Sequence, residues 1–301
     1  MTAPGVAGRE IAGPGYYVSV GTAILLSVAV VATVVLLAVR HPAQHVAGTA
    51  RPVNTFLPPP ATSTPTGRSQ PASSPAPTSR STPPTDSRQQ LATHPLSTSD
   101  AEMQTIVCSL TRFDPSDDRQ ASFFQQAKVC ADAAWDEALA AAGMPALPIQ
   151  LVTVHGEPAN TPCGPVKPAD HPTQCRATVY MTPAYLRDVE HNDRFPGRYF
   201  GVFLRTYASA VQEATGLTAL HAAAKGLPGA SAADLDTRLA QQATCLAGAA
   251  SGAMAGQGAV DTNITNEIRQ RLSTVDAPAD AAAWLAKGFA SRSFAACNSW
   301  V

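Results

Sequence analysis

The chain has 301 residues, of which 14% are charged, and its formal net charge is −1. Soluble domains carry roughly 25% charged residues, so this composition excludes a coiled coil, which needs many Glu and Lys residues. The near-zero net charge excludes a global positive field that would attract nucleic acid. The 26 prolines are unevenly spread, because eleven of them lie in residues 51–100.

Residues 16–39 form an uncharged, apolar run of 24 residues. A helix of about 20 apolar residues spans a bilayer, whereas the apolar region of a cleaved signal peptide has about 7–15 residues. The length therefore favours an uncleaved transmembrane helix over a signal peptide, with residues 1–15 as a cytoplasmic tail. Arg9 before the run and Arg40 after it barely discriminate between the two orientations.

The six cysteines decide the orientation better, because all of them follow the apolar run. An even set on one side of a membrane indicates disulfides, which form in an oxidising, extracytoplasmic compartment. Six buried free thiols are the alternative, and the lack of any CxxC spacing disfavours it. The sequence therefore predicts a single-pass cell-membrane protein with an extracytoplasmic C-terminal domain.

Residues 40–100 are predicted to be a disordered linker. Between Arg51 and Asp100, 29 of 50 residues are Pro, Ser or Thr. Such a segment buries too little apolar surface to offset the entropy lost on ordering. The composition also resembles that of O-glycosylated stalks. We expect the linker to hold the following domain away from the membrane.

Residues 101–301 are predicted to be one α+β domain, mostly helical with a small sheet. The acidic stretch 114–118 indicates a helix start, and apolar residues at helical spacing follow it. Residues 157–176, rich in Pro, Asn, Gly and Thr, are predicted to be a loop cross-linked by two cysteines. The first expected helix begins within 114–118 and ends at 142. Further helices are expected at 196–216, 232–255, 264–272 and 279–290, with a helical turn or two at 183–189. The expected strands cover 149–154 and 177–181.

Several short motifs occur in order along this domain. They are Cys163-Gly164 with a following Cys175, ATVYM at 177–181, a long helix carrying Val211-Gln212 and Gly216, CLAG at 245–248, WLAKGFA at 284–290 and CNSW at 297–300. Each motif alone is weak. Their order and spacing over residues 105–300 resemble the neutral zinc metallopeptidases, a bacterial family with a zincin-like fold.

The resemblance implies an HExxH helix, in which two histidines at i and i+4 bind zinc and the glutamate is the general base. In the family register this motif falls on Arg205-Thr206-Tyr207-Ala208-Ser209. Arg205 and Ser209 take the places of the two histidines, and Thr206 takes the place of the base. The third ligand falls on Ala240, and the acid before CLAG is Thr244. No zinc ligand remains, so we expect the zinc to be lost and no catalytic residue to be present.

Arg205 puts a permanent positive charge where the cation would lie. It can mimic the metal by pairing with Glu213 or with a carboxylate of a partner; the alternative is an ordinary salt-bridged or solvated surface residue. The histidines of the domain have no i, i+4 ligand spacing, so no replacement metal site is predicted. These histidines are His155, His171, His191 and His221.

Six cysteines permit 15 disulfide connectivities. Proximity along the chain and the family-like positions predict one set of pairs. The pairs are Cys108–Cys130, Cys163–Cys175 and Cys245–Cys297.

The leading hypothesis is a membrane-anchored, extracytoplasmic pseudopeptidase that binds a cell-envelope component, a peptide or another membrane protein. One alternative is an active metallopeptidase with non-standard ligands, which predicts bound zinc. The other is a structural envelope module unrelated to peptidases, which predicts that Arg205 and Ser209 do not face the region of Ala240.

Overall fold

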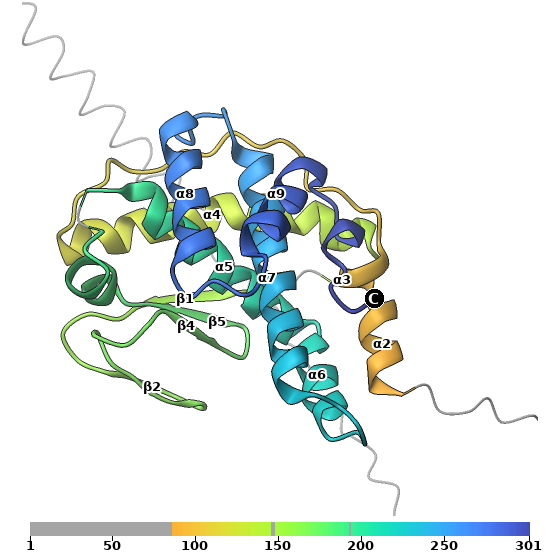
Figure 1. Ribbon diagram of the computed structural model, residues 1–301. Coiled ribbons are helices and arrows are strands. Elements are labelled where there is room, and N and C mark those ends of the chain that lie inside the picture. Colours follow the sequence, from red (N-terminus) through yellow and green to blue (C-terminus); the bar gives the residue numbers. More distant parts are fainter. Residues whose placement is uncertain (1–85, 146–147, 193) are drawn as a thin grey trace, which may run out of the picture. The chain divides into compact units, whose positions relative to one another are not determined.

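The computed structural model describes residues 86–145, 148–192 and 194–301. The predicted tail, the predicted transmembrane helix and most of the predicted linker lie outside the described residues. Within the described part, no helix is long and apolar enough to cross a bilayer. The fold there is α+β, mostly helical with a small sheet, as predicted (Figure 1).

The helices follow the sequence-based expectations closely, and the described part adds short elements that were not expected. The helices are α2 (Ser87–Thr93), α3 (Pro95–Thr98), α4 (Asp117–Ala141), the π-helical turn η1 (Tyr185–Val189), α5 (Pro196–Ala214), α6 (Leu217–Lys225), α7 (Ala232–Met254), α8 (Thr262–Thr274), α9 (Ala281–Ser291) and the 3-10 turn η2 (Ala295–Cys297). The strands are β1 (Gln150–Thr153), β2 (Ala159–Thr161), β3 (Gly164–Val166), β4 (Thr173–Cys175) and β5 (Thr178–Met181).

The long helix α5 packs against α4, α6, α7 and α8. Its aromatic side chains are buried, and the ring of Phe203 lies 6.1 Å from that of Phe124 on α4, centroid to centroid. Gly216 has a φ of 85°, a left-handed conformation that ends α5 and lets α6 begin at once. His221 therefore lies on α6, just past α5.

The three-stranded sheet has the order β1-β5-β4, with β1 parallel and β4 antiparallel to β5 (Figure 1). The predicted loop at 157–176 is wrong in part, because it contains the β2–β3 hairpin and the edge strand β4. These strands have three residues each, too few to show an alternating pattern in the sequence. Their pairing and the Cys163–Cys175 disulfide hold the segment together.

The predicted linker ends too late, because α2 and α3 belong to the folded domain. Leu91 and Leu96 are fully buried, and α2 packs against α6. The side chain of Asp86 accepts a hydrogen bond from the amide of Gln89 and caps α2. Two leucines and two caps thus order a stretch whose overall composition is that of a disordered chain.

His94 caps α3 through its Nδ1 atom, which accepts a hydrogen bond from the amide of Leu96 at 3.1 Å. Its Nε2 atom lies 3.3 Å from the carbonyl oxygen of Thr215. A cap of this kind needs a neutral imidazole, because a protonated ring has no acceptor. Burial lowers the pKa of His94, and the hydrogen bond to Thr215 opposes this shift.

Acidification is therefore expected to destabilise the α2–α3 segment. With the pKa of His94 depressed in the folded state, the unfolded chain takes up the proton first, and stability is lost as the pH falls below about 6.5. His94→Asn keeps a capping oxygen but does not titrate. Urea unfolding of the full chain at about pH 7.5 and about pH 5 should show a smaller loss on acidification in His94→Asn than in the wild type. Equal losses would contradict this role.

All three predicted disulfides are confirmed: Cys108–Cys130, Cys163–Cys175 and Cys245–Cys297. The third joins α7 to η2, and α7 also packs along α9. Three glycines sit where these two helices meet, and a Cβ on any of them would overlap the backbone of the other helix. They are Gly248 and Gly252 on α7 and Gly288 on α9. Helix α7 is therefore tied to α9 and η2 by close packing and by a covalent bond.

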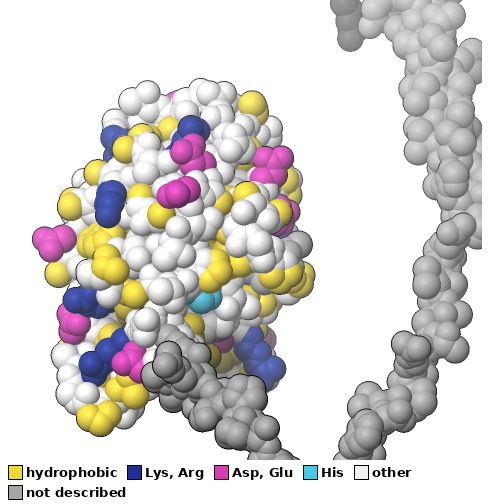
Figure 2. Space-filling model, turned by 90° about the vertical axis from the view of Figure 1, so that its right-hand side faces the viewer, with side chains coloured by type: hydrophobic (Ala, Val, Ile, Leu, Met, Phe, Trp, Pro, Cys, Tyr) yellow, Lys and Arg dark blue, Asp and Glu magenta, His cyan; other side chains and the backbone are white. Residues whose placement is uncertain are grey.

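Figure 2 shows one face of the domain, on which basic and acidic side chains are interspersed among uncharged ones. Mixed signs at short spacing cancel beyond about one Debye length, roughly 8 Å at physiological salt. This face therefore has no extended field of one sign, and any selectivity for a charged ligand must come from individual side chains.

Candidate functional site

Arg205, Thr206 and Ser209 of the family register lie in the middle of α5, and Ala240 and Thr244 lie on α7. Arg205 and Ser209 are half-buried, while Thr206 is buried. The hydroxyl of Thr206 donates to the carbonyl oxygen of Val202, one turn back in the same helix, at 2.9 Å. Thr206 thus occupies the place of the general base with a side chain that is hydrogen-bonded to its own helix.

Ser209 and Ala240 line a common cavity of about 260 Å³ between α5, α6, α7 and β4. In the family register both residues are expected at one site. Arg205 lies one turn from Ser209 on the same face of α5. The cavity is lined by Gln174, Ser209, Gln212, Thr218, Asp236, Leu239, Ala240 and Ala243. Thr244 is fully buried and is not among these residues.

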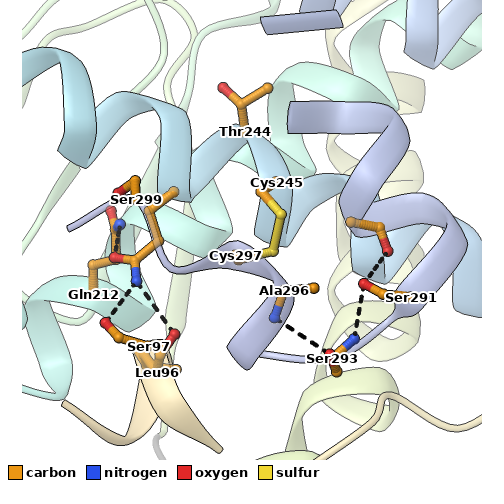
Figure 3. The surroundings of a disulfide bond; sticks show 12 residues. Leu96, Ser97, Gln212, Thr244, Cys245, Ser291, Ser293, Ala296, Cys297 and Ser299 are labelled. Atoms are coloured by element: carbon orange, nitrogen blue, oxygen red, sulfur yellow. Dashed lines mark hydrogen bonds between the residues drawn. A yellow bond between two sulfur atoms is a disulfide. The ribbon is translucent and has the colours of Figure 1, made fainter. Parts of the chain in front are cut away.

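The amide of Gln212 is held in place by a buried hydrogen-bond chain (Figure 3). Its Nε2 atom donates to the carbonyl oxygen of Leu239 at 3.2 Å and to Oε1 of Gln242 at 3.0 Å. Gln242 in turn donates to the carbonyl oxygen of Leu96 and to the hydroxyl of Ser97 on α3. Both N–H groups of Gln212 are thereby used, which leaves its Oε1 as an acceptor for a ligand.

Two further polar side chains of the cavity, those of Gln174 and Thr218, form no hydrogen bond with another described residue. Asp236 is the acidic member of the lining. Its Oδ1 lies 2.8 Å from Nζ of Lys225 and 3.0 Å from Nε2 of His221. The hydrogen bond from Lys225 lowers the pKa of Asp236, so this carboxylate is charged but compensated. The lining offers amides and hydroxyls to a ligand, which suits a neutral polar group better than a free ion.

Beyond Ser209, Arg205 reaches a cluster of charged side chains on η1, α8 and their flanking loops. Nη1 of Arg205 donates to the carbonyl oxygen of Asp276 at 3.0 Å. Arg271 makes a bidentate ion pair with Glu190, and the two side chains are only 1% and 5% exposed. Oδ2 of Asp276 lies 3.1 Å from Nε2 of His171. The expected pairing of Arg205 with Glu213 is wrong, because Glu213 accepts from the backbone amide of Arg176 and makes no ion pair with Arg205.

His171, Glu190 and Asp276 bring their ligand atoms within 4.8 Å of one another, the one such triad among the described residues. Sequence reasoning missed it, since no local spacing relates residues from three separate segments. Its surroundings oppose a divalent cation: Arg271 occupies both oxygens of Glu190, and Arg205 adds a second guanidinium. Burial lowers the pKa of Arg205, and Arg271 acts in the same direction, yet an arginine remains protonated at neutral pH.

The zinc site implied by the family resemblance therefore does not fit the residues of this chain. Arg205, Thr206, Ser209 and Ala240 offer no imidazole, thiolate or carboxylate, which are the groups that bind zinc in proteins. The other histidines do not supply a zinc ligand at these positions either. His155 and His191 are exposed, and His221 is buried beside Asp236. Burial lowers the pKa of His221, and Asp236 opposes this shift.

Comparisons with protein-family models, with curated proteins and with solved structures give no match to this chain. The function must therefore be argued from the site itself.

Proposed function

We propose that this protein is a membrane-anchored, extracytoplasmic pseudopeptidase that binds a peptide at the α5–α7 cavity without cleaving it. One observation carries the proposal: Ser209 and Ala240, which share one site in the family register, line one cavity, yet neither is able to bind zinc. Without a Lewis acid, water keeps its bulk pKa and no peptide carbonyl is polarised. Recognition would then remain without hydrolysis.

A peptide is the class of ligand that fits the strand beside the cavity. β4 is one of the two edge strands of the three-stranded sheet, and extended peptides add to such edges through main-chain hydrogen bonds. Gln174 lies in the middle of β4 and lines the cavity. A peptide along β4 would therefore place a side chain or its end beside Ser209 and Gln212.

The proposal predicts binding without metal or cleavage. The full chain, made in an oxidising host, is mixed with a random library of N-acetylated tetrapeptides. Bound peptides are identified by mass spectrometry, and zinc is measured in the same preparation. We expect enrichment of intact peptides, no hydrolysis, and zinc far below one per chain.

Ala240→Trp and Ala233→Trp serve as matched variants. Both alanines are exposed on α7, but only Ala240 lines the cavity. A tryptophan at position 240 would fill much of the 260 Å³, so we expect peptide binding to be lost there and kept in Ala233→Trp. Zinc near one per chain, with cleavage blocked by a chelator, would overturn the proposal. That result would favour the alternative of an active metallopeptidase with non-standard ligands.

A further inference from the structure

The guanidinium of Arg205 has donors that no described residue uses. An arginine has five N–H donors, and the described residues accept from Arg205 only at the carbonyl oxygen of Asp276. No carboxylate oxygen of the described part lies within ion-pair distance of it. Since α5 advances about 1.5 Å per residue, Arg205 lies roughly 6 Å along the helix from Ser209, and Ser209 lines the α5–α7 cavity.

The two acidic side chains near Arg205 already contact other side chains. Both oxygens of Glu190 accept from the buried guanidinium of Arg271. Asp276 lies 3.1 Å from Nε2 of His171 and 3.8 Å from Nη2 of Arg271. Neither acid therefore neutralises Arg205 directly, and an incoming anion meets a guanidinium whose charge is only partly compensated. Because Arg205 is half-buried, such an anion would be partly desolvated, which strengthens the attraction.

We infer that Arg205 binds the free C-terminal carboxylate of the peptide held at the α5–α7 cavity. Guanidinium groups pair with carboxylates through two parallel N–H···O bonds, and Arg205 has enough unused donors for this geometry. The amide and hydroxyl groups beside Ser209 would then face the last residues of the peptide. This inference rests on the proposed binding function. It specifies the C-terminal carboxylate as the group of the peptide that is recognised.

The test uses two copies of the tetrapeptide library, one with free C-termini and one with C-terminal amides. Both contain Asp and Glu at all positions. The full chain is compared with Arg205→Met, which keeps an apolar stem, and with Arg205→Lys, which keeps the charge but not the fork of donors. We expect the wild type to bind free C-termini about 10- to 100-fold more tightly than amides, the range for hydrogen bonds to a charged group. Arg205→Met should lose this preference, and Arg205→Lys should retain part of it.

The outcomes separate this inference from the proposed function. If the wild type binds both libraries equally and Ala240→Trp abolishes binding, the cavity binds peptides but Arg205 does not bind their C-terminal carboxylate. If amidated peptides containing Asp or Glu bind as tightly as free C-termini, the carboxylate recognised is a side chain, and the inference is wrong. Loss of the preference for free C-termini in Arg205→Met, with unchanged affinity for amidated peptides and an unchanged melting temperature, would support it. Binding of neither copy would overturn the proposed function itself.

Discussion

The Gly288→Ala variant is expected to unfold with a free energy about 2–3 kcal/mol below that of the wild type. A methyl group on Gly288 would overlap the backbone of Cys245 on α7 and lie in tight contact with that of Ala249. Backbone atoms of two packed helices have no rotamer to change, so α9 must move away from α7. The gain in helix propensity, about 1 kcal/mol for Gly to Ala, only partly offsets this cost. Thermal unfolding of the full chain should show a fall of about 4–12 °C, at about 2–4 °C per kcal/mol for a domain of this size.

Gly226→Ala is the matched control. Gly226 ends α6 with a φ of −78°, and its added Cβ would meet only the carbonyl oxygen of Ala223 at 3.4 Å, an ordinary contact. We expect its unfolding free energy to stay within about 0.5 kcal/mol of the wild type. Similar losses in both variants would show that the close contact of α7 and α9 is not what makes position 288 sensitive.

The helices could be predicted from the sequence because their signals are local. Acids in the first turn of α4 and apolar residues at helical spacing in α5 define elements of 25 and 19 residues, long enough for the period to show. The strands β2, β3 and β4 have three residues each. Their partners lie close in sequence, but strands this short cannot show an alternating pattern. Likewise, α2 and α3 depend on burial of single leucines in the domain, which composition averaged over 50 residues conceals.

The candidate site could likewise be predicted only in part. The i, i+4 spacing predicts that Arg205 and Ser209 share a face of α5, and the family register relates Ser209 to Ala240, which lines the same cavity. The partners of Arg205 follow no such rule. Glu190 and Arg271 are 81 positions apart, and His171 meets Asp276 only because the loop before β4 and the loop after α8 meet in the fold. Ion pairs between distant segments depend on tertiary structure, so the sequence indicated the position of Arg205 but not its surroundings.

The Arg271–Glu190 pair gives the second large expected effect. Removing one partner of a buried ion pair leaves an uncompensated charge and typically costs about 3–5 kcal/mol. We expect Glu190→Gln to lose stability in this range, because Arg271 is 1% exposed and cannot give up its proton. Asp234→Asn is the matched control: the pair of Asp234 with Arg238 has side chains 57% and 33% exposed, and such pairs contribute at most about 1 kcal/mol.

A double-mutant cycle tests whether these two residues act as a unit. Arg271→Gln leaves Glu190 buried, but a lone carboxylate can bind a proton and become neutral, so we expect a smaller loss than for Glu190→Gln. The double variant removes both charges and keeps two amides that can hydrogen-bond to each other. Its loss, measured by urea unfolding, should fall short of the sum of the single losses by more than about 1 kcal/mol. Additive losses within about 0.5 kcal/mol would mean that the two side chains are not energetically coupled. Glu190 would then not be held by Arg271, and the N–H donors of Arg205 would not be left free for a ligand by that ion pair.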